Sequence, residues 1–60
     1  MLISDNGLDM HINPYYIIRV WKTGSRETYY FAKIRGERDY VNIDKDSYDR
    51  IVEWMEQHDV

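Results

Sequence analysis

The chain has 60 residues, a net formal charge of −3 and no cysteine, which predicts one small domain (residues 1–60) without disulfides or thiolate metal sites. It has no apolar run near the ~20 residues of a membrane span and no signal-peptide pattern, so we expect a cytoplasmic protein without a membrane partner. Because so small a core usually needs further stabilisation, we also expect self-association as a homodimer.

Charge is distributed unevenly along the chain. The first segment, residues 1–13, contains two aspartates. Residues 14–43 carry six basic and three acidic side chains, whereas residues 44–60 carry two basic and six acidic ones. The middle of the chain reads as sheet and its end as helix. The predicted sheet is therefore basic and the predicted helix acidic, which favours a binding function.

The N-terminal segment contains one candidate strand. Apolar and polar residues alternate over residues 8–12, between turn signals at residues 5–7 and 13–14. We expect a short strand here, so the sheet has three or four strands in all.

Three further segments have strand character. Residues 15–22 (YYIIRVWK) and 28–35 (TYYFAKIR) are dense in β-branched and aromatic residues, and residues 39–43 (DYVNI) form a shorter run. Gly24 supplies the positive φ that a two-residue hairpin loop needs, and Gly36-Glu37 begins a second tight turn. The predicted arrangement is an antiparallel β-meander.

The period changes after the last strand. Apolar side chains recur at helical spacing, at Tyr48, Ile51, Val52 and Met55. Asp44 or Asp46 is the expected N-cap, and we expect a helix from about residue 46 to about residue 57. The predicted fold class is α+β, with this amphipathic helix packed on one face of the sheet.

The face that each strand residue takes depends on hairpin register. If both loops have two residues, Lys22 lies opposite Glu27 and Arg35 lies opposite Arg38, where the arginines either point into water or clamp an anion. The face toward the helix then holds Ile17, Trp21, Tyr30, Ala32, Ile34, Val41 and Ile43. The other face holds Lys22, Asn42 and the residues predicted to bind a partner or nucleic acid, which are Tyr16, Ile18, Val20, Tyr29, Phe31, Lys33, Arg35, Arg38 and Tyr40.

Two alternatives stay open at this point. A three-residue loop at residues 36–38 would pair Arg35 with Asp39 and turn every side chain of residues 39–43 to the opposite face. The apolar half of the partner face is either an interface or covered by the N-terminal segment. The residues available for that cover are Leu2, Ile3, Leu8 and Met10.

Residues 29–54 (YYFAKIRGERDYVNIDKDSYDRIVEW) resemble the AP2/integrase-arm type of DNA-binding domain, in which a three-stranded sheet backed by one helix lies in the major groove. Residues 31–35 (FAKIR) are similar to its second strand, and residues 38–40 to its third. The first strand departs from the family, because its expected outward positions are Ile18 and Val20. The resemblance implies that the residues facing DNA are Lys33, Arg35, Arg38 and Tyr40.

No catalytic constellation is apparent. The three serines have no nucleophile context, the glycines form no phosphate-binding loop, and His11 and His58 are far apart in the sequence. We therefore expect neither an enzyme nor a protein that binds a cofactor, a metal or a small-molecule substrate.

The main hypothesis is a small non-catalytic regulator or inhibitor that binds a protein partner as a homodimer, a type of chain common among accessory proteins of phages and mobile elements. DNA binding through the same face is the rival hypothesis, and a structural subunit of a larger assembly is a third. A variant of the main hypothesis uses a row of helix carboxylates that mimics DNA phosphates. These are Asp46, Asp49, Glu53 and Glu56.

Overall fold

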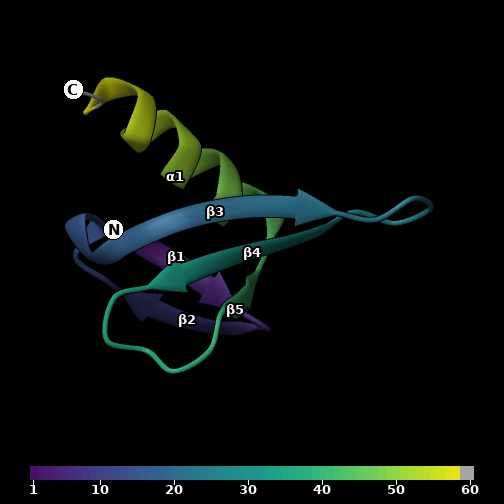
Figure 1. Ribbon diagram of the computed structural model, residues 1–60, viewed down its shortest axis with the longest axis horizontal. Helices are drawn as coiled ribbons and strands as arrows, with labels where there is room; N and C mark the ends of the chain where they lie inside the picture. Colours follow the sequence, from purple (N-terminus) through teal and green to yellow (C-terminus); the bar gives the residue numbers. More distant parts are fainter. Residues whose placement is uncertain (59–60) are drawn as a thin grey trace.

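The computed structural model describes residues 1–58 as a five-stranded antiparallel sheet and one C-terminal helix, an α+β fold (Figure 1). The remaining two positions of the predicted acidic segment lie outside the described residues. The strand order is β2-β1-β5-β4-β3. The elements are β1 (Leu2–Asp5), β2 (Leu8–His11), the 3₁₀ turn η1 (Pro14–Tyr16), β3 (Ile17–Thr23), β4 (Tyr29–Ile34), β5 (Val41–Ile43) and α1 (Lys45–Gln57). No helix within residues 1–58 is long and apolar enough to cross a membrane.

The N-terminal segment forms a hairpin that widens the sheet to five strands. Asn6 and Gly7 both have positive φ, 52° and 88°, as a two-residue hairpin loop requires. β1 pairs with β2 on one side and with β5 on the other. Ile3 is fully buried in the core, and Met10 packs against it. The alternative in which this segment covers the partner face is therefore wrong.

The β3–β4 hairpin has a longer loop than predicted. Residues 24–28 connect the strands, and Lys22 pairs with Tyr30 rather than with Glu27. The register is thus shifted by three residues. Because three is an odd number, the shift turns each β3 side chain to the face opposite the predicted one. Val20 consequently turns toward the core and Trp21 turns away from it, the opposite of both predictions.

A β-bulge at the start of β3 preserves one core position despite this shift. The register changes between Ile17 and Arg19, which leaves Ile18 without a direct partner. Ile17 still pairs with Ile34, and both side chains are buried. The bulge therefore keeps Ile17 in the core, as predicted, while Trp21 leaves it.

The β4–β5 hairpin has the register that was predicted for a two-residue loop. Tyr30 pairs with Ile43 and Ala32 with Val41, a count that continues to Arg35 opposite Arg38. The three-residue loop is therefore wrong. The strands end earlier than predicted, however, and both arginines lie in the loop between β4 and β5.

The helix closes a small isoleucine-rich core on one face of the sheet. α1 contacts β1, β3 and β4, and its Ile51 is fully buried. The core consists of Ile3, Ile17, Ala32, Ile34, Ile43 and Ile51.

Polar contacts fix the N-terminal end of α1, and an aromatic contact holds the helix near its C-terminal end. The Asp44 side chain caps the helix by accepting a hydrogen bond from the Ser47 N–H at 2.8 Å. The fully buried Ser47 hydroxyl accepts one from the Ser4 N–H of β1, also at 2.8 Å. At the other end, the Trp54 ring meets Tyr15 edge-on, with centroids 4.9 Å apart. The helix is thus joined to the sheet by local and long-range contacts.

Candidate binding face of the sheet

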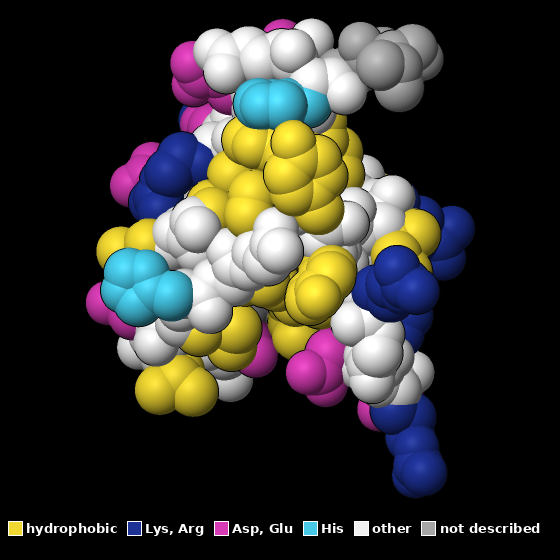
Figure 2. Space-filling view, turned by 90° about the vertical axis from the view of Figure 1, so that its left-hand side faces the viewer, with side chains coloured by type: hydrophobic (Ala, Val, Ile, Leu, Met, Phe, Trp, Pro, Cys, Tyr) yellow, Lys and Arg dark blue, Asp and Glu magenta, His cyan; other side chains and the backbone are white. Residues whose placement is uncertain are grey.

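The sheet face turned away from α1, here called the free face, is basic and aromatic. Because Ala32 and its partner Val20 point toward the core, their neighbours along each strand point the other way. The free face therefore presents Arg19 and Trp21 of β3 together with Phe31 and Lys33 of β4. Tyr40, just before β5, lies next to them and contacts the Phe31 ring. Figure 2 shows lysine and arginine side chains gathered along the right of the view, with an apolar side chain among them.

Three aromatic side chains pack together on the free face. The Trp21 and Phe31 rings stack with centroids 5.7 Å apart and an interplanar angle of 27°. Tyr40 meets both rings edge-on, at 5.7 Å and 5.2 Å. Tyr40 remains 58% exposed, so the cluster is still open to a partner. Edge-on and offset pairs of this kind stabilise a sheet and also provide apolar contact area.

Cations surround this aromatic cluster. The Arg19 guanidinium carbon lies 5.0 Å from the Trp21 ring centroid, a cation–π contact. Arg19 is also the direct cross-strand partner of Lys33, and like charges in that position destabilise a sheet. The Lys33 ammonium donates a hydrogen bond to the Glu37 carbonyl oxygen. The sequence predicted a cross-strand pair of like charges at Arg35 and Arg38. The structure instead has such a pair at Arg19 and Lys33.

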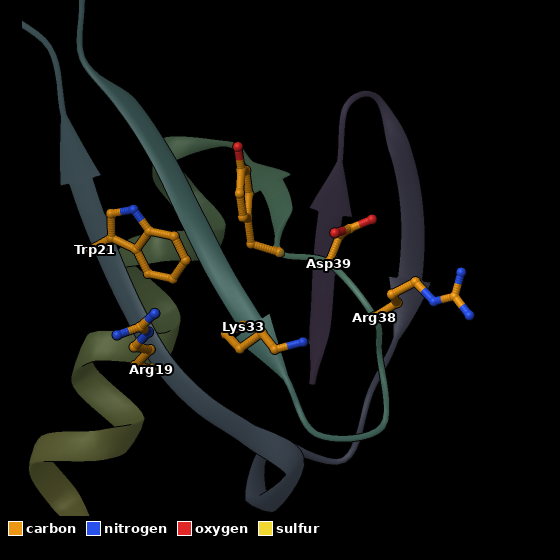
Figure 3. A pocket seen from close by; sticks show the side chains of 6 residues that line it. Arg19, Trp21, Lys33, Arg38 and Asp39 are labelled. Carbon is orange, nitrogen blue, oxygen red and sulfur yellow. The ribbon is translucent and has the colours of Figure 1, made fainter.

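These groups line an open cavity of about 490 Å³. Arg19 and Trp21 lie on one side of it, Arg38 and Asp39 on the other, and Lys33 between them (Figure 3). Its lining consists of Arg19, Trp21, Lys33, Arg38, Asp39 and Tyr40. Three cations against one carboxylate make the cavity attractive to anions, and its rings can hold a flat or apolar group.

The structure brings together only part of the predicted site. Phe31, Lys33, Arg38 and Tyr40 lie around the cavity, whereas the remaining predicted residues lie elsewhere. Tyr29 is on the free face near the 24–28 loop, where its hydroxyl donates to a Glu27 carboxylate oxygen at 2.9 Å. Tyr29 therefore lies on the free face but outside the cavity lining.

Four predicted residues take other positions, one of them Arg35, which lies in the loop between β4 and β5. Tyr16 belongs to η1, and its carbonyl accepts a hydrogen bond from the Arg35 N–H at 2.7 Å. Ile18 occupies the bulge and is 58% exposed. Val20 packs against the core, so its assignment to the binding face is wrong. Val20 faces the core because the register of the β3–β4 hairpin is shifted by three residues from the predicted one.

Sequence reasoning missed Arg19, Trp21 and Asp39. Arg19 and Trp21 are two residues apart in β3, so their side chains point to the same face. If a five-residue loop at 24–28 had been predicted, both would have been assigned to the free face. The sequence has no signal that marks the bulge. Among residues 1–58 there is no group of three or more histidine, aspartate or glutamate side chains arranged to hold a metal ion.

Comparison with models of known protein families, with characterised proteins and with solved structures gives no match to this chain. The cavity and the free face therefore carry the functional argument.

Proposed function

We propose that the protein is a small non-catalytic regulator or inhibitor that binds an acidic surface of a protein partner through the free face. The observation that supports this most is the aromatic cluster of Trp21, Phe31 and Tyr40, bordered by cations and not covered by any segment of residues 1–58. Tryptophan, tyrosine and arginine are the residues that dominate the binding energy of protein interfaces.

The charge of the free face favours a different partner over a second copy. A two-fold dimer brings the same patch of each copy together, so the cations of the cavity would meet their own equivalents. An acidic partner instead attracts both Arg19 and Lys33 and so offsets their mutual repulsion. Self-association is thus an outcome for the experiment to test, not the proposal.

DNA binding is the second candidate, and one specific observation favours it. The first strand of the resembling DNA-binding family presents arginines outward, and the observed register puts Arg19 outward on β3 in place of Val20. Against it, the β1–β2 hairpin extends the same face with Asp9, which pairs with Ser4 on the side away from Ile3. A carboxylate there would repel phosphates.

The test compares two variants with the same change in net charge. Lys33→Glu/Arg38→Glu removes two cations of the cavity, whereas Arg26→Glu/Lys45→Glu reverses two exposed cations elsewhere. Each immobilised protein is incubated with extract of the native cells, and the bound proteins are identified. A partner kept by the parent and the control but lost by the cavity variant supports the proposal. Equal retention by the cavity variant contradicts it.

Duplex DNA is tested with the same variants by mobility shift. Binding through phosphate contacts weakens steeply as salt rises, and the cavity variant should lose it while the control keeps it. Absence of a shift at low salt eliminates the DNA candidate. Sedimentation of the parent at micromolar concentration measures self-association separately.

A further inference from the structure

β3 forms one edge of the sheet, and its outer side has no strand partner within residues 1–58. The stretch from Arg19 to Thr23 pairs with β4 in unbroken register, beyond the bulge at Ile18. In Figure 1 the end of β3 and the loop that follows extend away from the C-terminal end of α1. An edge of this kind presents unpaired backbone N–H and C=O groups to which an extended segment can add as a strand.

We propose that the protein partner supplies an extended acidic segment that pairs with this edge of β3 as a sixth strand. The inference rests on the proposed function, because the cavity begins at the same strand: Arg19 and Trp21 belong to both the edge and the cavity lining. A segment on the edge therefore places its side chains next to the cations and rings described above.

The sequence of β3 specifies the chemistry of that segment. Side chains opposite Arg19 and Trp21 would lie on the free face, and those opposite Val20 and Lys22 on the side of α1. Opposite charges across a strand pair are stabilising, as are pairs of apolar or aromatic side chains. The edge runs cation, apolar, apolar, cation, so its complement is acid, apolar, apolar, acid. This pattern reads the same in both directions and therefore suits a parallel or an antiparallel strand.

The same pattern disfavours a second copy on this edge. β3 itself (IIRVWKT) has two cations and no carboxylate, so a second β3 paired with this edge would bring four cations together and offer Arg19 and Lys22 no opposite charge in any register. The opposite edge of the sheet, β2, carries Asp9 and would repel an acidic segment. Charge complementarity thus selects β3 and a partner that is not this chain.

The test uses the full chain and capped eight-residue peptides. The matched peptide has the core Glu-Val-Val-Glu between Ser-Thr flanks, and its control has Val-Glu-Glu-Val with the same composition and charge. We expect the matched peptide to bind about tenfold more tightly, since two favourable charge pairs replace two mismatched ones. In an amide NMR titration, its largest shifts should fall on Arg19–Thr23 and not on β2.

Peptide backbone methylation tests the strand geometry directly. Alternate amides of an added strand point toward β3, and the others point to solvent. Two versions of the matched peptide carry N-methyl groups on one or the other alternate set. Strand addition predicts that one version loses binding and the other keeps it.

Charge exchange provides a readout that a general structural defect would not give. The variant Arg19→Glu/Lys22→Glu should lose its preference for the Glu-Val-Val-Glu core and prefer Lys-Val-Val-Lys. Arg26→Glu/Lys45→Glu, which leaves the edge cations and the cavity in place, should keep the original preference. An amide spectrum of each free variant shows that it is folded.

The outcomes separate this inference from the proposed function. Equal binding of both peptides, or equal tolerance of both methylated versions, overturns strand addition and leaves an acidic partner on the free face in place. Failure of both peptides to bind, while the cavity variant still loses its cellular partner, also overturns strand addition alone. Failure of both peptides together with an unchanged cellular partner overturns both. Duplex DNA binding at the free face without peptide binding replaces them by the DNA candidate.

Discussion

Replacing Ser47 by alanine tests whether one buried hydroxyl joins the helix to the sheet. The Ser47 hydroxyl is fully buried and accepts a hydrogen bond from the Ser4 N–H, 43 positions away in the chain. Alanine leaves that N–H without its partner, which costs about 1–3 kcal/mol. Alanine also favours the helix by about 0.5 kcal/mol relative to serine, so we expect a net loss of about 0.5–2.5 kcal/mol in the free energy of unfolding.

Two measurements check this value. In a domain of this size, each kcal/mol lowers Tm by about 4–8 °C, which thermal or urea unfolding resolves. Amide hydrogen exchange should show faster exchange specifically at Ser4. Ser25→Ala, in the exposed 24–28 loop, is the control and should change neither quantity. If Ser47→Ala is as stable as the parent and Ser4 is equally protected, the hydroxyl does not join the two elements and the reasoning fails.

Further predictions concern the helix cap, the first long hairpin and the free face. Hydrogen bonds from Ser47 to Asp44 lower the pKa of that carboxyl below 3.8, so its stabilising contribution is complete above pH 3.8 and is lost as pH falls through the lower folded value. Asp44→Ala should therefore cost about 1 kcal/mol at neutral pH and show a smaller loss of stability on acidification, both measured by urea unfolding across pH. Gly24→Ala should destabilise the protein more than Gly36→Ala, because a Cβ at Gly24 would lie 1.8 Å from a backbone oxygen. At Gly36 only the positive φ opposes alanine, at a cost of about 1–3 kcal/mol. Equal Tm values for the two variants would contradict this. Lys33→Glu replaces the like-charge pair with Arg19 by an opposite-charge pair, so it should raise the free energy of unfolding by about 0.2–1 kcal/mol. This gain in stability should shrink at high salt. The same variant should bind the partner more weakly.

Local patterns predicted the elements whose signals lie within a few residues of each other. The helix N-cap at Asp44 and the register of the β4–β5 hairpin are confirmed. β1 was missed although Asn6-Gly7 is a strong hairpin signal, because four residues before that turn contain too little alternation to identify a strand. Its strand character comes from pairing with β5, which is distant in sequence.

On the free face too, local patterns predicted the position of some residues and not of others. Phe31 and Lys33 lie on the predicted face because β4 and β5 pair in the predicted register, and Tyr40, just before β5, packs against Phe31. Arg19 and Trp21 were not placed correctly, because a bulge and a five-residue loop together decide the face of β3. Each of these is a backbone irregularity with no dedicated residue pattern.

The sequence by itself determined that the chain combines strands with one acidic amphipathic helix, and that positive charge and aromatic rings concentrate in the strands. These properties follow from composition and short-range periodicity. Only the tertiary structure decided which of those rings and cations share a face, because a strand residue changes sides with each single step in register. The cavity beside Trp21 therefore exists through long-range pairing, although every residue that lines it could be read from the chain.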